Sequence, residues 1–161
     1  IHLENFVVLL LQSPTESCDI CRSQAHLPCA VQNGDSRINF GEFISLIKLS
    51  DLLICADTGP IHLASSLSVP VIGLYGPNTP LLYGPWGEVS SIFYKKLPCS
   101  PCITNYNAKI NKCRHPQGEG ACMREISVDE VLAEIETKYL GHNRKYSNPR
   151  WVRDECAAGV N

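Results

Sequence analysis

Apolar and polar residues follow one another along the chain in a pattern that predicts strands followed by helices. Short apolar runs that stop at Gly, Pro, Asn or Asp predict strands at residues 7–11, 29–31, 52–56, 69–75 and 91–94. Segments with apolar residues at helical spacing predict helices at residues 17–25, 40–49, 61–67 and 128–139. Strands that alternate with helices imply right-handed crossovers and a parallel sheet. The pattern therefore predicts an α/β fold with a Rossmann-like parallel sheet flanked by helices.

Some details of these elements can also be predicted. Asn39 is a natural N-cap for the helix at 40–49, and Ser127 with Glu130 forms a capping box for the helix at 128–139. The run at 52–56 is continuously apolar, so we expect a strand buried on both faces, with Cys55 in the core.

Proline and glycine punctuate residues 76–125, which predicts mainly loop, including a Cys-rich loop at 97–124. We expect one domain over residues 1–140, incomplete at its N-terminus, and a polar tail over residues 141–161. The chain begins at Ile1 without a Met and enters a strand almost at once, which hints at truncation or processing.

Composition narrows the class of protein. The chain has 161 residues, a formal net charge of -2, 19% charged and 44% hydrophobic residues, as in an ordinary globular protein. No basic excess indicates nucleic acid as a partner. The longest apolar run, Phe6–Leu11, is too short to span a bilayer and has no cationic leader, so it predicts neither a membrane span nor a signal peptide.

The turn after residue 56 is a candidate phosphate-binding site. Ligands of open α/β sheets bind outside the carboxyl ends of the strands, and the first N–H groups of a helix favour an anion. Gly59 lets a phosphate approach the backbone, Thr58 adds a hydroxyl donor, and His62 lies one helical turn further on. The alternative is an ordinary strand-to-helix turn, with Asp57 or Thr58 as a cap and His62 merely exposed.

The chain contains nine cysteines, and some of them form a second candidate site. Four thiolates spaced as Cys99-x2-Cys102-x10-Cys113-x8-Cys122 could enclose a tetrahedral zinc in a structural site, with His115 as a spare ligand. Disulfides and free thiols are the two alternatives. We prefer a reduced cytosolic setting, because a chain of this size needs no disulfide framework.

The region from residue 46 to residue 85 closely resembles the signature of glycosyltransferase family nine, the ADP-heptose:lipopolysaccharide heptosyltransferases and their relatives. In that family one strand is followed by the motif Asp-Thr-Gly-Pro-x-His-x-Ala, and residues 57–64 have this sequence. A second strand of the family ends in a Phe/Tyr-Gly-Pro-Thr-x-Pro loop, to which residues 75–80 are similar. The resemblance covers residues 5–140 and is most specific in its central third. Ser68 stands where the family commonly has Gly.

This resemblance implies a GT-B fold, in which two Rossmann-like domains face each other, and the chain resembles the C-terminal, donor-binding half. It implies inverting transfer that needs no metal, with a general base in the N-terminal domain. Because no acceptor domain precedes Ile1, we expect the isolated chain to be inactive and assign no catalytic residue.

The resemblance also implies a set of donor-binding residues. The positions that hold the diphosphate and the neighbouring sugar correspond to Asp57, Thr58, Gly59, Pro60 and His62. Glu16 would accept hydrogen bonds from the ribose hydroxyls, and Ile38 would lie against the base. The Gly76–Pro80 loop, with Gly76 and Pro77 as its site residues, would flank the same pocket.

We therefore expect the nucleotide-sugar-binding part of an inverting glycosyltransferase, with ADP-heptose as donor and a glycolipid or lipopolysaccharide-core acceptor. The resemblance places it in the cytoplasm and leaves open a peripheral position at the inner membrane. The alternatives are a non-catalytic nucleotide-binding or interaction module, a sugar-nucleotide epimerase-like enzyme and a metal-centred module. Trp86 could stack on a ligand or anchor its own loop.

Overall fold

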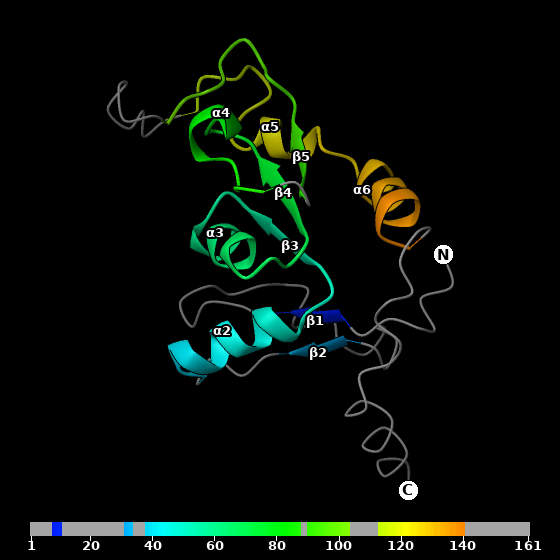
Figure 1. Ribbon diagram of the computed structural model, residues 1–161. Helices are drawn as coiled ribbons and strands as arrows, with labels where there is room; N and C mark the ends of the chain where they lie inside the picture. The colour runs from blue at the N-terminus through cyan, green and yellow to red at the C-terminus, as the bar shows by residue number, and fades with distance from the viewer. Residues whose placement is uncertain (1–7, 11–30, 34–37, 88–89, 104–112, 141–161) are drawn as a thin grey trace, which may run out of the picture. The chain divides into compact units, whose positions relative to one another are not determined.

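The computed structural model describes residues 8–10, 31–33, 38–87, 90–103 and 113–140 (Figure 1). The chain divides into two compact units, one formed by Ile1–Phe43 with Ser147–Asn161 and the other by Ile44–Tyr146. The helix predicted at residues 17–25 and the tail predicted from residue 141 lie outside the described residues.

The first unit contains a two-stranded parallel sheet and the start of a helix. Strand β1 (Val8–Leu10) pairs with β2 (Val31–Asn33), which begins later than predicted and includes Asn33. Helix α2 (Phe40–Leu49) has the predicted bounds. Its start is a complete capping box, because Asn39 Oδ1 accepts from the Glu42 N–H at 3.0 Å and Glu42 Oε2 accepts from the Asn39 N–H at 2.7 Å.

The second unit is built on a three-stranded sheet in the order β3-β4-β5, with every pairing parallel as predicted. The strands are β3 (Leu53–Ala56), β4 (Val71–Tyr75) and β5 (Ser90–Tyr94). The central strand β4 supplies much of the core, with Val71, Ile72 and Tyr75 at most 1% exposed. Parallel pairing of three strands gives one carboxyl edge, where the turns after β3 and β4 come together.

The prediction that β3 is buried on both faces is wrong for this unit. Ile54 is 44% exposed and Ala56 is exposed, whereas Leu53 and Cys55 are half-buried. Successive side chains of a strand point to opposite faces of the sheet, so the exposed Ile54 and Ala56 share a face that the described residues of the unit leave open at β3.

One face of the sheet is covered by α3 (Gly59–Ser66), which packs on β3 and β4 (Figure 1). A Cβ built on Gly73 would lie 2.7 Å from Ile61 Cδ1, so the glycine is what allows this helix to pack closely on the central strand. The short helix α5 (Ala121–Arg124) also packs against β4.

The other face receives the last helix. The buried Ser91 pairs in register with Ile72, which points away from Gly73 and α3. The Ser91 hydroxyl hydrogen-bonds with Glu134, accepts from Lys138 Nζ at 2.8 Å and lies 2.9 Å from the Tyr139 hydroxyl. This network attaches the C-terminal helix to β5.

The helix predicted at 128–139 is present, but it is built in two parts, α6 (Val128–Glu134) and a π-helical continuation η3 (Ile135–Leu140). Only half of the predicted capping box forms. Ser127 Oγ accepts from the Glu130 N–H at 3.2 Å, while the Glu130 carboxylate pairs with Lys95 Nζ at 2.7 Å instead of reaching back.

The segment predicted as loop contains one further short helix besides α5, namely α4 (Pro80–Tyr83). Thr79 caps α4 by accepting from the Leu81 N–H at 3.3 Å. None of the helices in the described ranges combines the length and apolarity that a membrane span requires.

Candidate donor site

The predicted phosphate-binding turn lies at the carboxyl edge of the second unit's sheet. Strand β3 ends at Ala56 and α3 begins at Gly59, so only Asp57 and Thr58 separate them. The Asp57 N–H donates to Leu74 O at 3.2 Å, which continues the β3–β4 pairing one residue past the strand. The turn is therefore held against the end of β4, the position where open α/β sheets bind ligands.

Gly59 has open space beside it. A Cβ built on Gly59 would meet no atom within 4 Å, and its φ lies outside the positive range that favours glycine. Neither packing nor backbone conformation therefore requires a glycine here. The open side lies at the first residue of α3, so an anion could come close to the backbone at the positive end of the helix dipole.

The Thr58 hydroxyl is engaged within its own turn. Thr58 is the N-cap residue of α3 in extended conformation, yet its side chain makes no capping hydrogen bond. Its hydroxyl donates instead to Ala56 O at 3.2 Å, so it must turn before it can donate to a ligand. Pro60 has no N–H to offer, and His62 is exposed on the first turns of the same helix.

The turn after β4 contacts the turn after β3 through Asn78, which lies in the loop predicted to flank the pocket and had no predicted role of its own. Asn78 Nδ2 donates to Asp57 Oδ2 at 2.6 Å. The two residues are 21 positions apart in the sequence, and no local pattern reveals a contact of this kind. The only signal was that Asn78 lies within the Gly76–Pro80 loop, which the resemblance had placed beside the pocket.

Residues of the Cys-rich loop hold the Gly76–Pro77 turn in place. The N–H groups of Cys102 and Ile103 donate to Pro77 O at 2.7 and 2.9 Å. Ser100 Oγ donates to Gly76 O at 2.7 Å. The Cys-rich loop therefore forms part of the framework of the site.

Two ionisable groups beneath the turn are held neutral. Burial, and then the negative charge of Asp57, raise the pKa of the Cys55 thiol to about 11. Burial, Asp57 and Cys55 raise the pKa of the Tyr75 hydroxyl, which donates to Tyr83 O at 2.7 Å. The Asp57 carboxylate thus stands above neutral groups at the carboxyl edge.

The four cysteines predicted to bind zinc, Cys99, Cys102, Cys113 and Cys122, are free thiols, and none of the described cysteines is paired in a disulfide. Burial and then the neighbouring Cys99, Cys113 and Cys122 raise the pKa of the Cys102 thiol, so these side chains lie in one neighbourhood. However, no three His, Cys, Asp or Glu side chains in the described ranges are arranged to hold a metal ion. The structural zinc stays a prediction from the sequence.

The remaining predicted site residues are placed only in part. Glu16 lies outside the described residues, and Ile38 is half-buried in the first unit, where its position is described within that unit alone. Gly76 is buried and Pro77 is half-buried at the end of β4.

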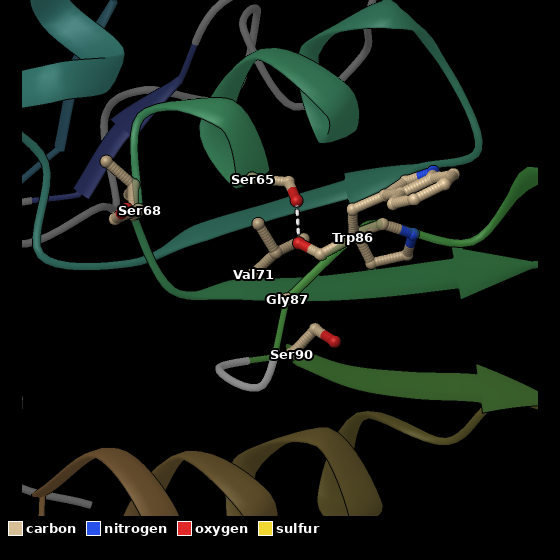
Figure 2. A pocket seen from close by; sticks show the side chains of 8 residues that line it. Ser65, Ser68, Val71, Trp86, Gly87 and Ser90 are labelled. Atoms are coloured by element: carbon tan, nitrogen blue, oxygen red, sulfur yellow. Dashed lines mark hydrogen bonds between the residues drawn. The ribbon is translucent and has the colours of Figure 1, made fainter.

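Trp86 does not line the candidate site. Its side chain is 86% exposed, so it does not anchor its loop either. It borders a pocket of about 100 Å³ together with Ser65, Ser68 and Ser90, and its carbonyl oxygen accepts from the Ser65 hydroxyl (Figure 2). This pocket lies at the amino ends of β4 and β5, the opposite edge from Asp57, and it is much smaller than a nucleotide-sugar site.

Fold and site define an α/β protein with a parallel sheet whose carboxyl edge carries an open glycine turn at a helix N-terminus. The chain belongs to glycosyltransferase family 9 (heptosyltransferase), whose family model matches residues 4–112.

Similar proteins agree with this assignment. The chain is 38% identical over 112 residues to lipopolysaccharide heptosyltransferase 1 of Pseudomonas aeruginosa, covering 65% of this chain and 31% of that protein. It is 34% identical over 95 residues to lipopolysaccharide core heptosyltransferase OpsX of Haemophilus influenzae, covering 56% and 27%. The chain spans between about a quarter and a third of the length of the curated relatives that it matches.

The fold is shared with a crystal structure of a glycosyl transferase family 9 protein from Veillonella parvula, at a TM-score of 0.66 and 21% identity. The similarity covers 85% of this chain and 37% of that one. The predicted α/β fold and the predicted family are both confirmed.

Proposed function

We propose that the chain binds the nucleotide-diphosphate sugar of an inverting glycosyltransferase, with ADP-heptose as the donor, and that it acts in synthesis of the lipopolysaccharide core or a related glycan. The observation that carries the proposal is the open side of Gly59 at the N-terminus of α3, directly after β3. The family assignment favours a transferase over the epimerase-like alternative.

The charges at the turn suggest where each part of the nucleotide sugar would lie. The diphosphate would lie at the N-terminus of α3, beside Gly59 and within reach of His62. Asp57 would not contact a phosphate, because two negative charges repel each other. Its carboxylate is suited to accept hydrogen bonds from hydroxyl groups of the ribose, which free ADP also carries.

This arrangement favours sugar transfer because negative charge grows on the leaving diphosphate as the glycosidic bond breaks. Pro60 has no N–H, and the Ile61 N–H already donates to Thr58 O at 3.1 Å, so the Gly59 N–H and the dipole of α3 would stabilise that charge without reorganising. In an inverting reaction the acceptor hydroxyl attacks from the opposite side of the sugar and loses its proton to a base. In this proposal the acceptor is a glycolipid or lipopolysaccharide core, and no residue described here is assigned as the base.

Isothermal titration of the purified chain with ADP, UDP and GDP tests the proposal. The chain is compared with an Asp57→Ala, His62→Ala double variant. Ser66→Ala is the matched control, because Ser66 is exposed at the other end of the same helix and its hydroxyl donates only to Leu63 O among the contacts of the described residues. Circular dichroism checks that all three proteins are folded.

We expect ADP to bind the chain and the Ser66→Ala control with equal affinity, and to bind the double variant at least tenfold more weakly, since two polar contacts are removed (about 1 kcal/mol or more each). A folded chain that binds none of the three nucleotides would overturn the proposal. Preference for UDP or GDP would keep the donor site and replace ADP-heptose with another class of sugar nucleotide.

A further inference from the structure

We infer that Asn78 is a positioning residue of the donor site, which fixes the Asp57 carboxylate from the neighbouring turn. The inference rests on the proposed function, because it assigns Asn78 a role in the same site. It also concerns this chain in particular, since Asn78 stands where the loop pattern of the family has Thr.

The orientation of the Asn78 amide is determined at both ends. Its Oδ1 accepts from the Thr79 N–H at 3.0 Å, and a backbone N–H can only donate. Its Nδ2 lies 2.6 Å from Asp57 Oδ2, and a carboxylate can only accept. An amide flip would break both hydrogen bonds, so the donor side of Asn78 is directed at Asp57.

The turn that carries Asn78 is itself rigidly held. Two backbone N–H groups, those of Cys102 and Ile103, converge on Pro77 O, the carbonyl directly before Asn78. On the other side, Gly76 packs so closely on α5 that a Cβ there would lie 2.6 Å from Met123 Sδ. Asn78 is therefore presented from a fixed backbone, as a positioning residue must be.

The contact matters because, within the described ranges, it is the hydrogen bond that fixes the Asp57 side chain. Its backbone pairs with Leu74, and Asn78 provides the side-chain hydrogen bond that the structure gives it. With one carboxylate oxygen occupied by Asn78, the rotation of the carboxylate is restricted and the other oxygen keeps one direction. A hydroxyl group of the bound nucleotide would then donate its hydrogen bond to a carboxylate oxygen that is already oriented.

A double-mutant cycle tests this role, using Asn78→Ala, Asp57→Ala and the double variant in the purified chain. The cycle is measured twice, once as ADP affinity by calorimetry and once as the equilibrium constant of urea unfolding without nucleotide. Asn78→Ala also removes the hydrogen bond from the Thr79 N–H, but it does so with Asp57 present or absent, so this loss cancels in the coupling free energy. Asn78→Asp serves as a second variant, because it keeps the acceptor for Thr79 and replaces only the donor by a second carboxylate.

We expect Asn78→Ala to weaken ADP binding about tenfold in the wild-type background and less than twofold in the Asp57→Ala background. The unfolding constant should change in the same pattern, and Asn78→Asp should bind ADP more weakly than Asn78→Ala. Equal effects in both backgrounds, or unchanged binding in Asn78→Ala, would overturn the inference.

The two measurements separate this inference from the proposed function. If the folded chain binds no ADP, the proposed function fails, and the unfolding cycle still decides whether Asn78 fixes Asp57. If ADP binds and the unfolding cycle shows no coupling between the two residues, the proposed function stands and Asn78 has no positioning role.

Discussion

At the scale of single residues, glycines occur around this site for two opposite reasons. Gly76 is needed because the side chains of Cys122 and Met123 would collide with a Cβ there, at 2.9 and 2.6 Å. Gly59 has empty space beside it and a φ that any residue can adopt. The open side of Gly59 is what the proposed donor site needs, because a phosphate there must come close to the backbone.

The raised pKa of Cys55 gives a prediction about its reactivity. Because burial and Asp57 raise the pKa of Cys55 to about 11, its thiolate fraction should be very small at neutral pH. We expect alkylation of Cys55 by iodoacetamide to rise about tenfold per pH unit up to about pH 10 without levelling off. Peptide mass spectrometry after timed alkylation measures this rate separately from the other cysteines.

The same pKa has a consequence for stability. The pKa is higher in the folded chain than the ordinary value of 9.0, so the folded state retains the proton more strongly. This contribution to the free energy of unfolding is fully present below about pH 9 and is lost as the pH rises through about 11. An alkylation profile that levels off near pH 9 would contradict both statements.

Ser68 is strained where the family commonly has glycine. It has a φ of 59° at the end of α3, where the Ser68 N–H donates to Ser65 O at 3.1 Å and the Val69 N–H donates to Ala64 O at 2.9 Å. This is the hydrogen-bond pattern of a Schellman motif, whose left-handed residue is usually Gly.

We expect Ser68→Gly to raise the free energy of unfolding by about 1 kcal/mol, because glycine adopts a positive φ without steric cost. Urea denaturation measures the change. Ser66→Gly is the matched control within α3 and should lower the stability by about 0.5–1 kcal/mol. A Ser68→Gly variant no more stable than the wild type would show that the strain is relieved in solution.

At the scale of secondary-structure elements, α5 and the turn after β4 form one packed unit. Gly76→Ala forces a Cβ against Met123 and Cys122, so we expect it to lower the free energy of unfolding by about 1–3 kcal/mol. Gly59→Ala is the control in the other turn and should change stability by less than about 0.5 kcal/mol, because nothing lies within 4 Å. Urea denaturation of both variants gives the comparison, and equal losses would contradict the packing argument.

The pattern of apolar residues predicted most of these elements. It gave the bounds of α2 and the parallel strands β3 to β5 nearly as the structure has them, because apolar periodicity directly reflects burial within one element. It missed α4 and α5, which are four-residue helices too short to show a period. It overestimated the burial of β3, because a strand's neighbours in the sheet cannot be read from the strand itself.

The candidate site could be predicted only where its residues are close in the sequence. Residues 57–59 were singled out because a strand end, a glycine and a helix start are adjacent in sequence. The contacts of Asn78 and Ser100 could not be predicted, because each joins residues more than 20 positions apart. Long-range hydrogen bonds of this kind depend on how the loops fold together, which no local pattern records.

The zinc prediction belongs to the Cys-rich loop and can be decided by metal analysis. The spacing of Cys99, Cys102, Cys113 and Cys122 predicts one zinc per chain. In the structure these thiols are free and no three of them form a ligand set, so zinc binding would require the loop to draw together. Elemental analysis should find about one equivalent of zinc, and chelation should expose the four thiols to alkylation. A metal-free chain with all four thiols reactive would show that they are free.

At the scale of the whole molecule, nucleotide binding and folding should be coupled. The candidate site consists of two turns at the carboxyl edge of the sheet, and these turns are adjacent only when β3 and β4 are paired. The unfolded chain therefore has no site, and a nucleotide that binds only the folded chain must stabilise it.

We expect ADP at about a hundred times its dissociation constant to raise the free energy of unfolding by about 2.7 kcal/mol. Gly59→Ala should fold as stably as the wild type without ADP, yet gain much less from ADP, because the added methyl group occupies the open side of the turn. Urea denaturation of both proteins with and without ADP measures the four values. If Gly59→Ala gained as much as the wild type, the nucleotide would bind elsewhere on the molecule and the space beside Gly59 would need another explanation.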